Sequence, residues 1–209
     1  MSETHKQRLH DGLTKIREAV IWKTEGLSEY DVRRPLTHTG TNLLGLIKHL
    51  SVGEAWYFGA VFARPFEPHL PWWDDDAPEG ADMWVTASES RQDILETYRA
   101  VIAHADETIR ALDMDAPGHV PWWPRPDVML HGVLVHVLIE TARHAGHADI
   151  LREQLDRQTG CEPTTLTKGC TTTGGGPSSA HRSSPPRNPL LRRERTVSRA
   201  TSRYADRGR

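Results

Sequence analysis

The sequence predicts an all-α protein, a four-helix bundle with a long crossover between the second and third helices. Four segments carry apolar residues at the spacing of a helix. A connection over residues 63–85 separates the second segment from the third, and such long connections are uncommon unless they are functional or cross the fold. No segment shows the alternation of a strand. Bundles with one long crossover often hold a metal site in their core.

The first two helices are predicted from their apolar residues. The first carries a stripe at i, i+4, i+7 and i+11, formed by Leu9, Leu13, Ile16 and Val20. Residues 26–41 are rich in turn formers and are expected to be a loop. The second helix is expected over residues 42–62. It is apolar over much of its circumference, which indicates a central position.

The third helix is predicted to open with Thr86-Ala-Ser-Glu89, the pattern of a capping box. One face of this helix is apolar along its length, through Ile94, Tyr98, Val101, Ala105, Ile109 and Leu112. The fourth helix is expected to start after Pro126 and to reach about Arg157. Its amphipathic pattern is interrupted by polar residues along one edge of the apolar face.

Charge and composition divide the chain into two predicted parts. Residues 1–160 hold 16 Lys and Arg against 25 Asp and Glu, together with all seven tryptophans. This acidic part is long enough to bury a core and is not expected to bind nucleic acid. Residues 161–209 hold 10 Lys and Arg against 3 Asp and Glu, with runs of Thr, Gly, Ser and Pro. We expect a disordered low-complexity extension there, the alternative being a basic tail that contacts anionic partners.

The expected location is the cytoplasm. Both cysteines, Cys161 and Cys170, lie outside the acidic domain, so no disulfide and no thiolate ligand is expected within it. The first residues lack the pattern of a signal peptide. No apolar run approaches the roughly 18–20 residues that span a bilayer, so no membrane partner is expected.

Glu140 and His144 are the first candidates for a functional site. They are four residues apart, so on a helix their side chains lie one above the other and can meet one ion. His136 and His147 project nearby, and this polar stripe runs along the edge of the apolar face. A carboxylate and an imidazole at the edge of a core need a partner, and a divalent metal is the simplest one. A helix pair on the solvated surface is the plainer alternative.

A third ligand must come from another helix, and His49 of the apolar second helix is the natural candidate. A hydrogen-bonded core histidine is the alternative there. Glu54 competes for the role, but it projects roughly 140° away from His49 around the helix axis. We therefore expect Glu54 to be a buried structural acid without a catalytic role.

Two tryptophan pairs, Trp72-Trp73 and Trp122-Trp123, each follow a proline near the ends of predicted helices. They could roof an apolar substrate pocket near the metal or cap the ends of the bundle. We expect capping.

Two stretches of the sequence resemble a known family. LTHTGTNLLGLIKHL at residues 36–50 and ETARHAGHADILRE at residues 140–153 resemble the DinB-like superfamily. The resemblance is strongest to the actinobacterial branch that includes mini-circle proteins and is related to mycothiol-dependent enzymes. It covers about residues 5–158 and implies a four-helix bundle whose metal ligands correspond to His49, Glu140 and His144. Many DinB-like proteins have histidine in place of the glutamate, whereas the mycothiol-dependent maleylpyruvate isomerase type has the same His, Glu, His set.

The ligand set implied by the resemblance suits Zn²⁺ best, although Ni²⁺, Mn²⁺ or Fe²⁺ can be held by two histidines and a carboxylate. His147 is either an outer acid–base group or a surface histidine, and no role is assigned to His136. The resemblance further implies mycothiol as a co-substrate. The partners expected are a small-molecule substrate and, as an open alternative to a monomer, a second copy of the chain.

The leading hypothesis for function is a metal-dependent, mycothiol-dependent S-transferase or isomerase acting on a small electrophile. One alternative is a hydrolase that uses metal-activated water. The other is a non-catalytic, stress-related protein that binds a metal or ligand. Metal content and thiol dependence of turnover distinguish the three.

Overall fold

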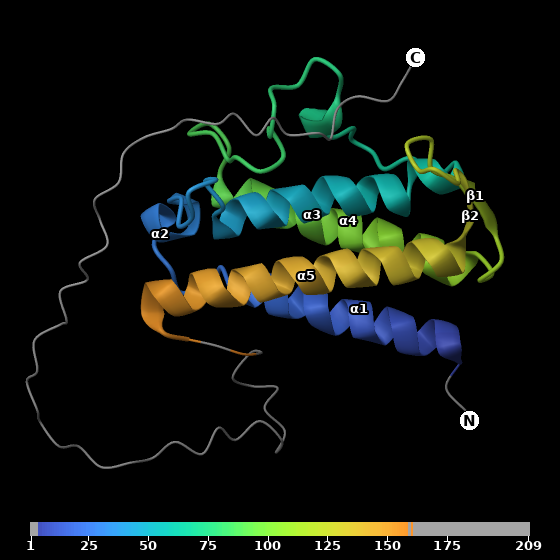
Figure 1. The fold of residues 1–209 in the computed structure, drawn as a ribbon, viewed down its shortest axis with the longest axis horizontal. Helices are drawn as coiled ribbons and strands as arrows, with labels where there is room; N and C mark the ends of the chain where they lie inside the picture. Colours follow the sequence, from blue (N-terminus) through green and yellow to red (C-terminus); the bar gives the residue numbers. More distant parts are fainter. Residues whose placement is uncertain (1–3, 159, 161–209) are drawn as a thin grey trace, which may run out of the picture. The chain divides into compact units, whose positions relative to one another are not determined.

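The computed structural model describes residues 4–158 and 160. Within this part of the chain, four long helices carry the fold: α1 (His5–Trp22), α3 (Leu43–Tyr57), α4 (Arg91–Ala111) and α5 (Leu130–Asp156). Helix α1 packs on α5, and α3 packs on both α4 and α5; Figure 1 shows this side-by-side arrangement. The predicted all-α class is confirmed.

Side-chain caps at their N-termini explain where three of the long helices begin. Thr4, Asn42 and Ser90 each accept a hydrogen bond from the backbone N–H three residues further on. The third long helix therefore begins at Arg91, and its predicted start at Thr86 is wrong. One of the two bonds of a capping box does form, with Thr86 N donating to Glu89 Oε2 over 2.7 Å, but it closes a turn ahead of the helix.

Short elements depart from the sequence predictions in three places. The expected loop over residues 26–41 contains helix α2 (Glu29–Arg33). The second long helix ends at Tyr57, and a 3-10 turn, η1 (Ala60–Phe62), follows it. Strands β1 (Pro117–His119) and β2 (Asp127–Met129) form an antiparallel pair with Pro117 opposite Met129, so the fourth helix starts at Leu130. Three residues are too few for alternation to mark a strand in the sequence.

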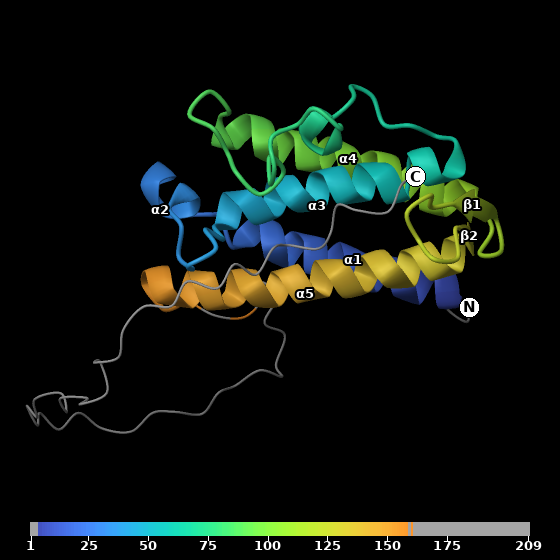
Figure 2. The ribbon, with the colours of Figure 1, turned by 45° about the horizontal axis from the view of Figure 1, so that its top comes forward.

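The core lies between the long helices. The predicted stripe of α4 is buried from Ile94 to Ile109, and Leu13 and Val20 of α1 are buried as well. Helix α3 is buried on most of its faces, as a central helix should be. The crossover, which contains the 3-10 turn η2 (Pro71–Trp73), passes over α3, as Figures 1 and 2 show.

A buried ion pair joins α1 to α3. The Arg17 guanidinium binds the Glu54 carboxylate, and both side chains are almost fully buried. Tyr98 of α4 donates a hydrogen bond to Glu54 Oε1 over 3.1 Å, and Asp106 of α4 accepts a second bond from Arg17 over 2.8 Å. Burial and the Glu54 carboxylate hold the pKa of Tyr98 well above its usual value. Glu54 is thus occupied in a structural network away from His49.

The low-complexity segment predicted for residues 161–209 lies outside the described residues.

Candidate functional site

His49 and His144 meet where α3 runs beside α5. Their ring centroids are 4.8 Å apart, and the two rings are inclined edge to face. The side chain of His144 is 12% exposed and that of His49 is 27% exposed. The structure therefore brings two of the three predicted ligands together from different helices, at a position that solvent still reaches.

Glu140 stands one turn before His144 on the same helix. Its Oε2 atom is 3.6 Å from Nε2 of His144, and its Oε1 atom is 3.8 Å from a guanidinium nitrogen of Arg143. Glu140 is half-buried. As the side chains stand, no group of three or more His, Cys, Asp and Glu residues in the described part of the chain is arranged to hold a metal ion. His49, Glu140 and His144 thus lie near one another, but their side chains do not converge on one ion position.

The His144 side chain has two features that would suit a metal ligand. Its Nδ1 atom is buried and has no hydrogen-bond partner among the described residues, a costly state for a polar atom. Burial lowers the pKa of His144 to about 4, and charge on His49, His147 and Arg143 acts in the same direction. The imidazole is therefore neutral at pH 7 and keeps a lone pair, which is the form that binds a metal. The residues present fit a divalent ion.

Asp82, in the crossover, completes the surroundings of His49. Its Oδ2 atom lies 2.6 Å from Nδ1 of His49, and the indole Nε1–H of Trp73 donates to the same oxygen over 3.0 Å. Burial alone would raise the pKa of Asp82, but the hydrogen bonds from His49 and Trp73 outweigh it and lower the pKa. Asp82 is not among the residues predicted from the sequence, because no spacing rule connects it to a histidine 33 residues earlier.

The crossover is fixed to α3 beside His49. The buried Lys48 ammonium donates to Trp84 O over 2.7 Å, and it pairs with Glu89 Oε1 at 2.7 Å. At Gly45 the chain comes so close that a Cβ atom there would collide with the carbonyl oxygen of Met83. These contacts hold residues 82–84 against the face of α3 that carries His49.

The two flanking histidines pack against other rings. The His147 ring lies 5.4 Å from the His144 ring, and its side chain is exposed. The His136 ring packs between Tyr57 at 4.8 Å and Trp123 at 4.7 Å. Burial lowers the pKa of His136, while the Glu140 carboxylate acts in the opposite direction. His136 is therefore part of an aromatic cluster one turn from Glu140.

The tryptophan pairs have different roles, and the expectation of capping is wrong for the first pair. The Trp73 ring is 6.1 Å from the His49 ring. Trp72 covers the Lys48 ammonium at 4.6 Å. Trp122 and Trp123 pack near the start of α5, where each contacts Tyr57. One indole therefore forms a wall of the candidate site.

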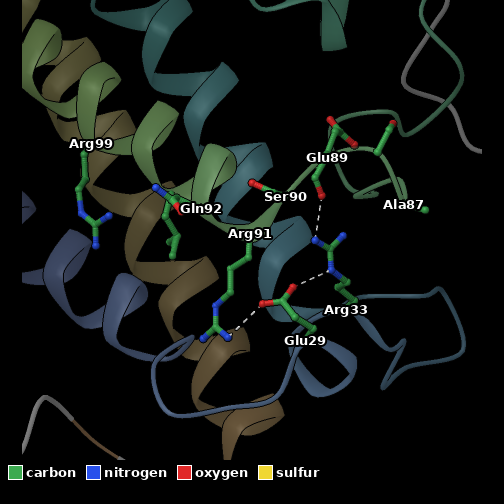
Figure 3. Close-up of a pocket in the computed structure, with 10 residues that line it drawn as sticks. Glu29, Arg33, Ala87, Glu89, Ser90, Arg91, Gln92 and Arg99 are labelled. Atoms are coloured by element: carbon green, nitrogen blue, oxygen red, sulfur yellow. Dashed lines mark hydrogen bonds and ion pairs between the residues drawn. The ribbon is translucent and has the colours of Figure 1, made fainter.

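A surface hollow of about 590 Å³ lies elsewhere, between α2 and the beginning of α4. Figure 3 shows its charged lining, in which Glu29 pairs with Arg33 and Arg91. None of the predicted site residues lines this hollow. It is therefore separate from the position where His49 and His144 meet.

Comparison with known proteins gives a family and a fold. The model of the mycothiol-S-transferase family matches residues 8–157. No curated protein matches the chain. A solved structure described as a conserved protein of locus from Enterococcus faecalis is similar at a TM-score of 0.54 and 17% identity, over 73% of this chain and 97% of that one. This likeness concerns the fold alone. None of the helices in the described part of the chain combines the length and apolarity of a membrane span.

Proposed function

The chain belongs to the mycothiol-S-transferase family of the DinB-like superfamily, and on that premise we propose that it is a metal-dependent enzyme that joins mycothiol to a small electrophilic substrate. The resemblance found in the sequence is confirmed by this membership. In the reaction proposed, the thiol gives up its proton and its sulfur attacks an electrophilic carbon: the S–C bond forms while the bond from that carbon to its leaving group breaks, and that group departs as an anion. In the isomerase alternative the sulfur would instead add to a carbon–carbon double bond, and the S–C bond would break again when the thiol is released.

We place the metal at His49, Glu140 and His144. One observation carries this assignment: the rings of His49 of α3 and His144 of α5 face each other at 4.8 Å, and Glu140, one turn before His144, lies 3.6 Å from its Nε2 atom. Two imidazoles and a carboxylate suit Zn²⁺ and can also hold Ni²⁺, Mn²⁺ or Fe²⁺. When bound, such an ion would lower the pKa of a thiol so that the thiolate is present at neutral pH.

The protein's own residues would serve this chemistry in two ways. His144 is neutral at pH 7 because burial lowers its pKa, so it does not have to lose a proton before it binds the ion. The side chains of His49 and Glu140 are partly exposed, which would allow the thiol and the substrate to approach. The Trp73 ring supplies an apolar wall next to His49, suited to the carbon skeleton of a small electrophile.

Metal content and thiol-dependent turnover test the proposal together. The protein would be purified without an affinity tag, analysed for metals, stripped with a chelator and reloaded with zinc. Conjugation of mycothiol to a halogenated aromatic electrophile would then be followed by absorbance. We expect turnover that needs both zinc and mycothiol, that is lost in His49→Ala and His144→Ala, and that survives in His136→Ala. Zinc-dependent turnover without thiol would support the hydrolase instead, and bound zinc with no turnover would support a binding protein.

A further inference from the structure

Asp82 of the crossover binds Nδ1 of the His49 side chain. A carboxylate can only accept hydrogen bonds, so the short contact of 2.6 Å between Asp82 Oδ2 and Nδ1 of His49 places the proton on Nδ1. In a neutral imidazole, Nε2 is then the nitrogen with the lone pair. The hydrogen bond to Asp82 thus fixes both the orientation of the His49 ring and which of its two nitrogens keeps the lone pair.

We propose that Asp82 is the positioning residue of this site: it fixes the Nδ1–H form of His49 and keeps Nε2 free for a metal ion. The inference rests on the proposed function in that it takes His49 as a ligand. Histidine ligands commonly donate their second N–H to a carboxylate, which fixes the ring and raises its basicity. Nothing in the spacing of the sequence connects Asp82 with this role.

Asp82 can position His49 because its own carboxylate is fixed. Trp73 donates to the same Oδ2 atom over 3.0 Å, and the Trp73 ring lies 6.1 Å from the His49 ring. The backbone that follows Asp82 is held by Lys48, which donates to Trp84 O over 2.7 Å. A carboxylate held from two directions restricts the rotamer of the imidazole that it binds.

The docking of the crossover should therefore be coupled to metal binding. If the ion needs His49 Nε2, then any change that releases Asp82 from His49 weakens the ion's hold, even though Asp82 does not touch it. Loss of a group of this kind typically lowers metal affinity by about 10- to 100-fold. The structural alternative is that Asp82 only anchors the crossover, in which case stability would change and the state of His49 would not.

Zinc affinity of full-length variants, measured by competition with a chelating dye, is the first test. Asp82→Ala should bind zinc about 10- to 100-fold more weakly than the wild type. Asp82→Asn keeps an oxygen that can accept a hydrogen bond from His49, so its zinc affinity should lie between those of the wild type and Asp82→Ala. Asp75→Ala is the matched control, because Asp75 is an exposed carboxylate of the same crossover, and its affinity should equal that of the wild type. Thermal melts of each metal-free variant verify folding.

The second test observes His49 without any metal. Nitrogen-15 spectra of the metal-free protein, at a pH where the ring is neutral, report which nitrogen carries the proton. We expect the Nδ1–H form in the wild type and in Asp82→Asn, and a shift toward the Nε2–H form in Asp82→Ala. If Asp82→Ala fails to fold, Trp73→Phe removes one of the two hydrogen bonds to the carboxylate and should weaken both readouts to a smaller extent.

The two readouts separate this inference from the proposed function. A wild-type protein that binds no zinc would overturn the metal assignment, while the spectra would still decide whether Asp82 sets the state of His49. Wild-type zinc affinity in Asp82→Ala together with an unchanged proton position on His49 would overturn the inference, even if the enzyme is active.

Discussion

Acid should destabilise the metal-free protein through His144. Burial lowers the pKa of this group to about 4, against 6.5 for an ordinary histidine. Between these two values the unfolded chain takes up a proton that the folded chain refuses, so the free energy of unfolding falls as the pH falls from 6.5 toward 4. Above pH 6.5 both states are neutral and the effect vanishes. Lowering the pH from above 6.5 to below 4 should reduce the free energy of unfolding by about 3 kcal/mol through this group. At pH 5 the reduction should be about 2 kcal/mol.

The assay compares the wild type with His144→Asn, which keeps a polar side chain but cannot titrate. Urea unfolding of both proteins would be followed by circular dichroism at pH 7.5 and pH 5, with a chelator present. Other titrating groups act in both proteins and cancel in the comparison. The wild type should lose about 2 kcal/mol more than the variant between the two pH values. Equal losses, or a smaller loss in the wild type, would refute the burial of a neutral His144.

Three further predictions concern the stability of the folded protein. Glu54→Gln should cost about 1.5–3 kcal/mol in urea unfolding because it removes the charge of the more buried of the two carboxylates that bind Arg17, while Asp106 remains; Glu153→Gln on the surface of α5 should change little. A cost below about 1 kcal/mol would show that the buried pair is not as described. Gly45→Ala should lower the melting temperature because its Cβ would collide with Met83 O, and a melting temperature at or above the wild type would contradict this close approach. Gly132→Ala, on an open face of α5, should raise the melting temperature, since alanine is favoured over glycine inside a helix by about 1 kcal/mol; a lower value would show that this face is not open.

The long helices could be predicted from the sequence because their apolar stripes are local signals. The stripe of α4 is buried as expected, with Ile94, Tyr98 and Ile109 all in the core. The start of this helix was misplaced because two capping patterns follow each other, and Ser90, the later one, caps the helix. The strands β1 and β2 escaped prediction because their pairing joins residues on either side of a loop, and each is only three residues long.

The candidate site shows the same limit. Glu140 and His144 could be found together because one helical turn separates them. His49 could be proposed only from its apolar helix and from the family resemblance. Asp82 could not be found, because it reaches His49 through the docking of the crossover on Lys48 and Gly45, which is a matter of tertiary packing. Local sequence patterns could therefore predict the candidate residues that lie on helices, but not Asp82, which lies in the crossover.

Zinc titration of the metal-free protein tests the central claim most directly. The wild type and His136→Ala should each bind one zinc ion per chain, and His49→Ala, Glu140→Ala and His144→Ala should lose that tight site, with all variants shown to be folded by circular dichroism. A folded wild type that binds no zinc, or a His49→Ala variant that binds it as tightly as the wild type does, would contradict the assignment of the metal to these three residues.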